Sequence, residues 1–357
     1  MEIEILLSII FGVLAILAIF EEEDYMDYKP YLYWGICIML IVVAGFREIG
    51  SDHDSLNYQY TYMYGSSMNM EIVSEISFTW ICNLFNALRL DVRFFFLFYA
   101  ILGVTLKFIA FRRLSSLYFI PAFTYFSYYF MLHDMTQIRA GIASAMILFA
   151  IKPIQEGNRL KALAYLLIAL FFHYSSAIVL PLVFLSNKDL DGKRIILWAS
   201  IVPATYFLYF IHFNIITSIP LPMFSDKIEL YQTMKDKGLM GEDINVFNVF
   251  HLFRVFIYLY ALYFYETIKA FNPYITILLK IMGISIASLV IFSALPVFAF
   301  RVSELFGIVD IIIITSIYYT LKPSYFSKFV IVVMNAAIFL LSIVYNGLFD
   351  PTKAPDF

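Results

Sequence analysis

The sequence predicts an all-α integral membrane protein, a polytopic helical bundle. Its 357 residues are 62% hydrophobic, only 14% are charged, and the mean hydropathy is +0.82. A water-soluble domain needs more polar surface than this composition supplies. Apolar runs recur close to the ~20 residues that a helix needs to cross a bilayer, which favours helices over a barrel of alternating strands. The net charge of −3 argues against a nucleic-acid partner.

The positions of Lys and Arg predict the membrane topology. They mark successive short loops that we expect to share the cytoplasmic side, which requires about twelve spans and puts both termini outside. The expected spans are 3–20, 31–46, 94–111, 117–132, 137–151, 160–172, 174–186, 194–211, 249–268, 273–292, 300–320 and 327–346.

The stretch 160–186 is predicted to be two short antiparallel helices that meet near His173. A single helix would move one of the two flanking basic loops to the outside, against the usual charge bias. A turn at membrane depth is tolerated where its backbone faces protein or a water-filled cavity. We therefore expect His173 at the floor of a wet cavity that opens outward.

The whole chain, 1–357, is expected to form a single membrane domain with two larger outer loops. The first, 47–93, contains the apolar stretch EISFTWICNLFNALRL, which we interpret as an amphipathic helix that lies in the outer interface or enters the membrane and returns. The second, 212–248, contains a charged stretch of helical periodicity. It is a candidate lid over the cavity that selects the substrate, and a passive loop is the alternative.

Polar residues gather at the outer ends of the predicted spans, where arginines are unusual and polar groups are suspected of function. Guanidinium groups around one cavity have the planar multi-donor geometry that suits phosphate, so we expect an anionic ligand. The set is Arg47, Glu48, Asp52, His53, Asp54, His133, Asp134, Gln137, Arg139, His173, Arg254, Arg301 and Glu304.

Structural interpretations compete with this one. Arg47 and Asp52 could pair with each other on a solvated loop, and Arg301 and Glu304, three apart on one helix, could neutralise each other. Arg139 could extend to lipid headgroups, and His173 could be a packing residue. We expect three charged residues to be structural: Lys107 extends to the cytoplasmic interface, and Lys280 pairs with Asp310 inside the membrane.

The sequence gives no reason to expect a metal or another cofactor. No DxD motif or dense set of Asp, Glu and His is present. Cys37 and Cys82 have no CxxC or histidine companion, so we expect both to be packing residues.

Five motifs occur in order between about residues 40 and 310. Together, FREIGSDHDSLNYQY, EISFTW, QIRAGIA, FHYSSAIVLPL and FRVSELF resemble the EpsG branch of the Wzy-type polysaccharide polymerases. The resemblance implies a GT-C-like bundle with short and re-entrant helices. The residues that match the family pattern are Arg47, Gly50, Asp52, Tyr58, Gln137, Arg139, His173 and Arg301. The Gln-Ile-Arg order replaces the usual Arg-Gln, which leaves open whether Gln137 or Arg139 takes the family role.

The resemblance implies a glycosyltransferase that joins undecaprenyl-diphosphate-linked oligosaccharide repeats at the outer face of the bacterial cytoplasmic membrane, in the synthesis of O-antigen, exopolysaccharide or capsule. Its partners would be those lipid-linked oligosaccharides, membrane lipids, a chain-length regulator and a flippase. Arginines would stabilise the leaving diphosphate in place of a metal. The candidate general bases are His173, Asp52 and His133. The candidate binding residues for diphosphate and sugar are Arg47, Arg139, Arg301, Gln137, Tyr58, Arg254 and Glu304.

Two other functions remain open at this stage. An O-antigen ligase shares the same donor and the same use of arginine, and differs in its acceptor. A lipid-linked oligosaccharide flippase or other transporter would place charges through the middle of the bundle and show inverted repeats, and neither pattern is evident. A membrane acyltransferase is disfavoured because its acyl donor is cytoplasmic, whereas His173 is expected to face outward.

Overall fold

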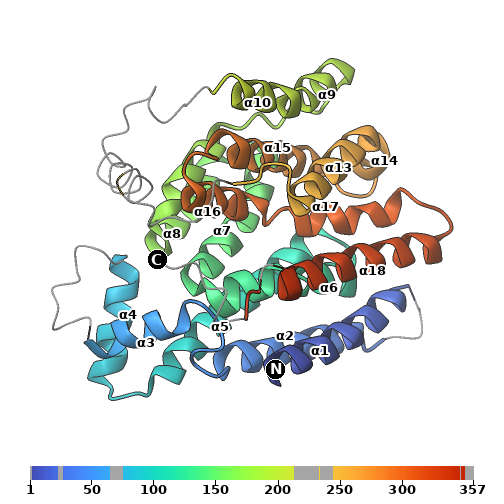
Figure 1. The fold of residues 1–357 in the computed structure, drawn as a ribbon. Coiled ribbons are helices and arrows are strands. Elements are labelled where there is room, and N and C mark those ends of the chain that lie inside the picture. Colours follow the sequence, from blue (N-terminus) through green and yellow to red (C-terminus); the bar gives the residue numbers. More distant parts are fainter. Residues whose placement is uncertain are drawn as a thin grey trace.

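The computed structural model describes residues 2–22, 27–64, 75–212, 233, 244–345 and 347–349, and the regular structure of these residues is helical (Figure 1). The helices of the first half are α1 (Glu2–Ile19), α2 (Lys29–Gly45), α3 (Ser55–Tyr64), α4 (Ile76–Ala87), α5 (Val92–Leu114), α6 (Phe119–Phe126), the π-helix η3 (Phe130–Thr136), α7 (Ile138–Gln155), α8 (Arg159–Phe172) and the 3-10 helix η4 (Tyr174–Phe184).

The second half continues with shorter pieces. They are α9 (Gly192–Ala199), α10 (Ile201–Phe210), α13 (Val249–Tyr263), α14 (Tyr265–Lys269), α15 (Ile275–Ile291), α16 (Pro296–Gly307), α17 (Asp310–Ser316), η5 (Ile317–Tyr319), α18 (Ser324–Leu340) and η6 (Leu341–Tyr345). Several predicted spans, such as 300–320 and 117–132, are thus built from two or three consecutive helices with a change of helix type or direction between them.

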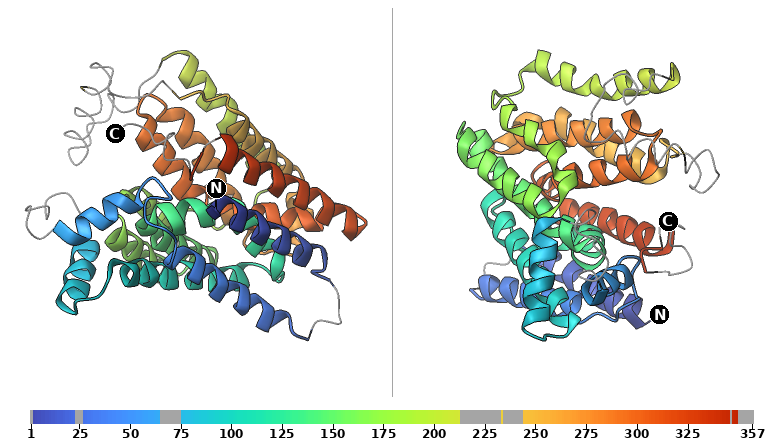
Figure 2. Two further views of the ribbon diagram at one scale, coloured as in Figure 1. Left: turned by 60° about the horizontal axis from the view of Figure 1, so that its bottom comes forward. Right: turned by 90° about the vertical axis from the view of Figure 1, so that its left-hand side faces the viewer.

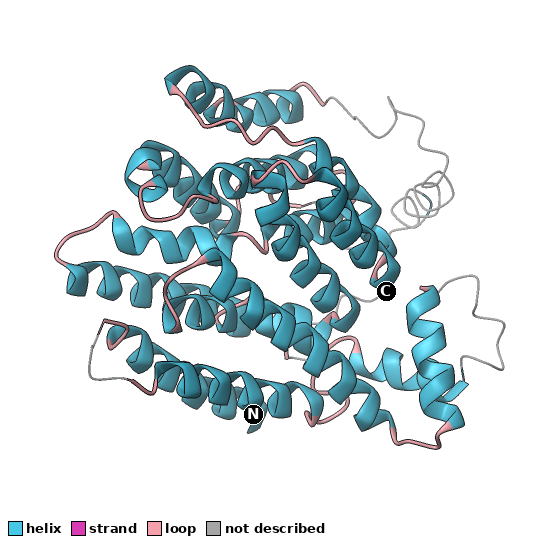
Figure 3. Ribbon diagram, turned by 180° about the vertical axis from the view of Figure 1, so that it is seen from behind, coloured by secondary structure: helices cyan, strands magenta, loops and turns pink. Residues whose placement is uncertain are grey.

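The bundle is organised around α7. Every residue from 140 to 151 is buried, as expected for a helix that is apolar on all sides. Helix α7 packs against α5 and α8, and α2 packs on the far side of α5. The α1–α2 pair and the α9–α10 pair lie at opposite sides of the molecule in Figures 1 and 3 and in the right view of Figure 2. Helices α3 and α4 stand together at one end, beside α8 (Figure 1).

Three described helical segments are long and apolar enough to cross a membrane: Val92–Leu114, Ile138–Gln155 and Ser324–Val344. Shorter apolar helices accompany them. The sequence therefore predicted the all-helical class correctly, and the apolar helices agree with a membrane bundle. The number of twelve spans and the GT-C-like arrangement stay predictions.

Several helices begin where a short polar side chain caps them. The side chains of Asp91, Asn158, Asp191 and Asn248 each accept a hydrogen bond from a backbone N–H in the first turn of α5, α8, α9 and α13. Each cap satisfies one of the N–H groups that a helix start leaves without a partner. These caps define the helix starts through contacts between residues two or three positions apart.

The predicted hairpin in 160–186 is present. Helix α8 ends at Phe172, His173 has extended backbone angles, and η4 begins at Tyr174. After η4 the chain returns to the short turn that precedes α8. There, the Asn187 side-chain amide donates to the carbonyl of Gln155, the last residue of α7, over 3.0 Å. The two basic loops therefore lie at the same end of the hairpin, as the charge distribution predicted.

The two predicted outer loops are described only in part. Helix α4 lies within the predicted interfacial helix of loop 47–93, and residues 65–74 of that loop lie outside the described residues. Most of the predicted lid, 213–232 and 234–243, also lies outside them. The lid stays a prediction.

The expectations for Lys107, Lys280 and Asp310 were wrong. Lys107 does not reach an interface: it is fully buried and pairs with Asp134, with 2.6 Å between Nζ and Oδ2. Asp310 pairs with Arg254. Lys280 instead donates to the carbonyls of Ser186 and Lys188. Depth along a helix did not identify the partners, because the broken helices bring other elements to the same level.

Candidate functional site

One carboxylate joins three separate elements at the end of the bundle where α3 and α4 lie. Glu75 precedes α4, is 5% exposed, and forms an ion pair with Arg139 from the first turn of α7. Its second carboxylate oxygen, Oε1, lies 3.1 Å from Nδ1 of His173, at the junction of α8 and η4. We call Glu75, Arg139 and His173 the Glu75 cluster.

Backbone contacts hold Glu75 in this position. The Ser77 hydroxyl donates to the carbonyl of Phe171 over 2.6 Å, and the backbone N–H of Ile76 donates to the Tyr174 hydroxyl over 3.1 Å. Both contacts tie the first turn of α4 to the residues on either side of His173. The α8–η4 hairpin therefore positions the carboxylate and the imidazole together.

Aromatic rings surround the Arg139 guanidinium, whose central carbon lies 5.4 Å from the Tyr58 ring centroid and 5.2 Å from that of Phe78. Such cation–π contacts favour the charged form and fix its orientation. Burial raises the pKa of Tyr58 to about 12, against the opposing charge of Arg139, so its hydroxyl stays protonated. Tyr58 is thus a hydrogen-bond donor beside the cluster.

The charges of the cluster determine the state of Glu75. Burial alone would raise the pKa of this carboxyl, but the hydrogen bond from His173 and the charge of Arg139 outweigh burial and lower the pKa to about 2. Glu75 is therefore ionised at any physiological pH. An ionised carboxylate on Nδ1 orients the imidazole and leaves Nε2 for other partners.

Arg301 and Asp54 extend the polar region from the cluster. Arg301, on α16, is exposed and has no hydrogen-bond or ion-pair partner among the described residues. Its charge acts on both Asp54 and His173. Burial and the nearby Asp52 raise the pKa of Asp54, and the charges of Arg301 and Arg139 oppose them. The first half of α16 and the loop before α3 thus face the same region.

Arg47 and Asp52 form a separate pair. Arg47 Nε donates to Asp52 Oδ2 over 2.9 Å, and Nη1 donates to the Ala44 carbonyl over 2.6 Å. The other Asp52 oxygen accepts backbone N–H groups of Asp54 and Ser55 and caps α3. The pairing interpretation is therefore confirmed, although the pair is buried and not solvated. Gly50, in the same loop, has a φ of +93°, which favours glycine.

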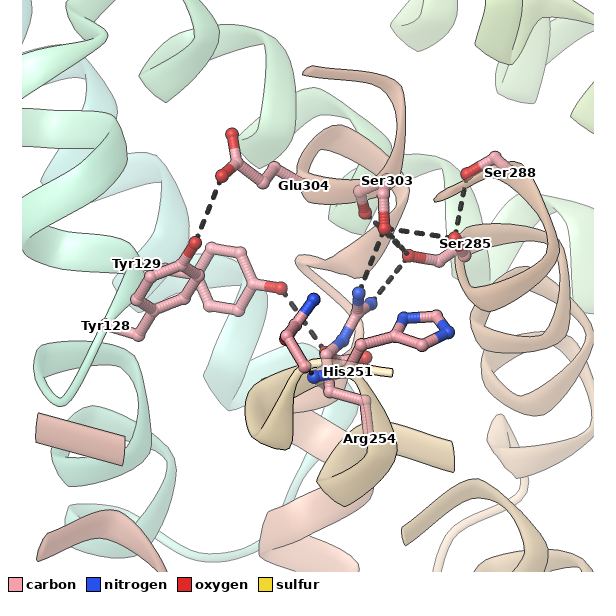
Figure 4. A network of polar contacts seen from close by, with 10 residues as sticks. Tyr128, Tyr129, His251, Arg254, Ser285, Ser288, Ser303 and Glu304 are labelled. Atoms are coloured by element: carbon pink, nitrogen blue, oxygen red, sulfur yellow. Dashed lines mark hydrogen bonds and ion pairs between the residues drawn. The ribbon is translucent and has the colours of Figure 1, made fainter. Parts of the chain in front are cut away.

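Arg254 is the centre of a second buried network (Figure 4). Its Nε donates to Asp310 Oδ2 over 2.6 Å, while Nη1 and Nη2 donate to the hydroxyls of Ser303 and Ser285 over 3.0 and 2.6 Å. Tyr129 also donates to Asp310. Arg254 thereby connects α13 to α15, α16 and α17, and each of its three guanidinium nitrogens donates a hydrogen bond.

Glu304 lies between the Glu75 cluster and the network around Arg254. Tyr128 donates to Glu304 Oε1 over 3.1 Å (Figure 4), and the Gln137 side chain is also hydrogen-bonded to this carboxylate. The charges of both Arg254 and Arg301 act on it. Glu304 therefore connects the corner at Gln137 to α16, and the described residues show no direct pair between Glu304 and Arg301.

His133 is buried inside η3, with 1% of its surface exposed. Its ring packs on Tyr129, with 5.3 Å between centroids, and Nδ1 has no partner among the described residues. The tight outer corner expected at residues 133–139 is thus a π-helix, followed by the start of α7. Arg139, in the second part of the corner, belongs to the Glu75 cluster, and the charge of His173 also acts on His133.

The structure groups the predicted residues selectively. It brings Arg139, His173 and Tyr58 together, with Arg301 facing them and Gln137 and Glu304 adjoining. The remaining candidates, Arg47, Asp52, His133 and Arg254, lie in other buried contacts. Sequence reasoning did not select Glu75 as a site residue, although Glu75 is the first residue of the EISFTW motif, directly before the apolar part of the amphipathic segment. Within the described ranges, no group of three His, Cys, Asp or Glu residues is suited to a metal.

Comparison with known proteins gives one match. The model of the EpsG family matches residues 30–351. No curated protein matches the chain, and no solved structure matches it.

Proposed function

Because this chain belongs to the EpsG family, we propose that it is a polysaccharide polymerase, a membrane glycosyltransferase that joins undecaprenyl-diphosphate-linked oligosaccharide repeat units. It would act as a multi-pass protein of the bacterial cytoplasmic membrane, with its site at the outer face. Family membership and the apolar helices support a membrane protein of polysaccharide biosynthesis. The observation that supports the reaction most is the contact of the Glu75 carboxylate with both Arg139 and His173.

In the proposed reaction, a sugar hydroxyl of the incoming repeat unit attacks the anomeric carbon that links the growing chain to its lipid. A new C–O bond forms while the C–O bond to the diphosphate breaks, and undecaprenyl diphosphate leaves with the bonding electrons. The hydroxyl proton passes to a general base. His173 is suited to this role, because the ionised Glu75 accepts a hydrogen bond from Nδ1–H and leaves a lone pair on Nε2.

The leaving diphosphate needs positive charge, which Arg139 and Arg301 would supply. Arg139 is held by Glu75 and two rings and retains further N–H donors. Arg301 is exposed, and its charge acts on the same Asp54 carboxyl as the charge of Arg139. A well-placed donor to a developing negative charge contributes about 2 to 4 kcal/mol to the transition state. Tyr58, Gln137 and Glu304 are proposed as sugar contacts around this centre, and the proposal uses no metal.

Purified protein in proteoliposomes, supplied with a lipid-linked repeat unit, tests the proposal through the length of the chains formed. We expect His173→Ala and Arg301→Ala each to reduce the rate by about 100-fold or more, while the folded protein is recovered in normal amounts. Arg93→Ala is the matched control, because Arg93 is an exposed arginine at the start of α5, outside the cluster. It should polymerise normally.

The same assay separates the competing functions. A flippase would move the lipid-linked repeat without forming a new glycosidic bond, and an O-antigen ligase would transfer a chain only to a different acceptor. Polymerisation at a near-normal rate by His173→Ala would remove the general-base role. Failure of the wild-type protein to elongate any lipid-linked repeat tested would count against the polymerase assignment.

A further inference from the structure

A fully buried ion pair lies behind the corner that presents Arg139. Lys107, on α5, donates from Nζ to both oxygens of Asp134, over 2.6 and 2.9 Å, and to the carbonyl of Gly141 over 2.7 Å. The Tyr125 hydroxyl donates to Asp134 Oδ2 over 2.6 Å. The side chains of Lys107 and Asp134 are 0% and 1% exposed.

This network is saturated. An ammonium group has three donors, and Lys107 has three acceptors around it. Each Asp134 oxygen accepts at least one hydrogen bond, and both side chains are shielded from solvent. The network therefore offers no exposed group to a substrate, and its role lies in the geometry that it imposes on the chain.

The geometry concerns the residues on either side of Arg139. Asp134 belongs to the π-helix η3, and Gly141 lies in the beginning of α7. Lys107 thus binds the chain five residues before Arg139 and two residues after it. A π-helix is rare, and most examples are single turns that are often found at functional sites. The ammonium group closes the corner in which this irregular helix becomes a regular one.

Two glycines, one on α5 and one on α7, leave room for the Asp134 carboxylate to pack against both helices. A Cβ added at Gly141 would lie 2.7 Å from the His133 carbonyl oxygen and 3.0 Å from Asp134 Oδ1. A Cβ at Gly103, on the facing surface of α5, would also meet Asp134 Oδ1. The ion pair, the glycines and the π-helix are therefore one packed unit.

We propose that Lys107 and Asp134 are positioning residues that set the placement of Arg139 relative to Glu75. The role rests on the proposed function in so far as Arg139 binds the leaving group. Breaking a buried pair by removing one partner leaves an uncompensated charge and destabilises the fold, whereas replacing both partners by apolar groups is often tolerated. A double substitution therefore separates positioning from folding.

The first experiment compares Lys107→Met/Asp134→Leu with the wild type. We expect a similar amount of folded protein but a polymerisation rate per folded molecule at least tenfold lower, with the loss in kcat and not in KM. Lys280→Met is the matched control, because Lys280 is also buried and donates only to backbone carbonyls elsewhere. It should keep the wild-type rate per folded molecule. A normal rate in the double variant would overturn the proposal.

The second experiment measures position without using activity. Arg139→Cys is made in a background without Cys37 and Cys82, and its modification by a membrane-impermeant thiol reagent is timed. Adding the double substitution should change that rate at least threefold, while a cysteine at Asp54 should keep its rate. An unchanged rate at 139 would overturn the positioning role even if the protein proves not to be a polymerase.

The experiment has a second background in case the first does not fold. Lys107→Met/Asp134→Asn keeps the side-chain shape and an acceptor for Tyr125. If both backgrounds fail to fold while Lys280→Met folds, the pair is a folding determinant and the positioning role is rejected.

Discussion

At the scale of single residues, neighbours decide what each polar group can do. Asp52 and Glu75 are both buried carboxylates paired with an arginine, which lies in the same loop for Asp52 and on a distant helix for Glu75. Asp52 uses its second oxygen on backbone N–H groups, so it caps a helix. Glu75 uses its second oxygen on an imidazole, so it can control a base. The difference between a structural and a functional carboxylate is thus one hydrogen-bond partner.

The charge of Glu75 gives a prediction about pH. Its pKa lies at about 2, below the ordinary value of 4.5, so its ion pairs stabilise the fold fully above pH 4.5 and are lost only as the pH falls toward 2. Protonation of Glu75 therefore does not limit activity near neutral pH. We expect Glu75→Gln to reduce polymerisation at least tenfold and to move the acid limb of its pH profile to lower pH.

The physical reason is that a neutral amide no longer stabilises the imidazolium form of His173. The measurement is the rate of chain elongation between pH 5 and 9. Glu48→Gln, at an exposed glutamate of the same loop, should leave the profile unchanged. A profile that is the same in Glu75→Gln and the wild type would contradict a Glu75–His173 pair in the reaction.

At the scale of elements, helices are joined by side chains from distant segments. Glu21, after α1, is 3% exposed and accepts the backbone N–H groups of Tyr118, Phe119 and Ile120 over 2.7, 2.6 and 3.0 Å. It occupies the start of α6 as a capping residue would, although it lies almost one hundred residues away in the sequence. This contact fixes α1 against α6.

We expect Glu21→Gln to lower the stability by about 1 to 3 kcal/mol, because an amide has only one acceptor oxygen for three donors. The measurement is thermal unfolding of the purified protein in detergent. Polymerisation per folded molecule should be unchanged. Glu156→Gln, at an exposed residue paired only with Lys152, is the control and should unfold at the wild-type temperature.

The contact between α7 and η3 gives a second prediction at this scale. A Cβ at Gly141 would be 2.7 Å from a backbone oxygen of η3, which cannot move away alone. Gly141→Ala should therefore destabilise the protein by about 1 to 3 kcal/mol. Gly12→Ala is the matched control, because nothing lies within 4 Å of its added Cβ in α1. It should be neutral or stabilising by up to about 1 kcal/mol. Equal stability of the two variants would show that the α7–η3 contact is looser than described.

At the scale of the whole molecule, the α8–η4 hairpin brings the elements of the Glu75 cluster together. It returns the chain to the same end and places its turn, at His173, beside α4 and α7. Three elements far apart in the sequence then meet at one end of the bundle. A membrane protein with such a site needs that end to face one side only.

Labelling of single cysteines in a background without Cys37 and Cys82 tests this topology. A cysteine at Glu48 should react with an impermeant reagent added outside, whereas cysteines at Glu156 and Lys188 should react only after permeabilisation, because basic loops stay inside. All three positions are exposed. Outside labelling at 156 or 188 would contradict the assigned orientation of the hairpin.

The sequence alone determined the helical class, the break at His173 and part of the site. Composition and the length of the apolar runs depend on the solvent around the chain and not on tertiary contacts, so they could be interpreted directly. The break followed from the two basic loops. Arg139 and His173 were selected because charged and polar residues are costly in apolar surroundings. Tyr58 was selected only through the resemblance to the EpsG family.

Only the tertiary structure decided which charges pair. Arg254 with Asp310, Lys107 with Asp134 and Glu75 with Arg139 join segments that are 56, 27 and 64 residues apart. In a low-dielectric interior an unpaired charge is far costlier than a paired one, so each charge must find a partner. Which partner it finds depends on where broken helices bring the chain back, and helical periodicity contains no information about those breaks.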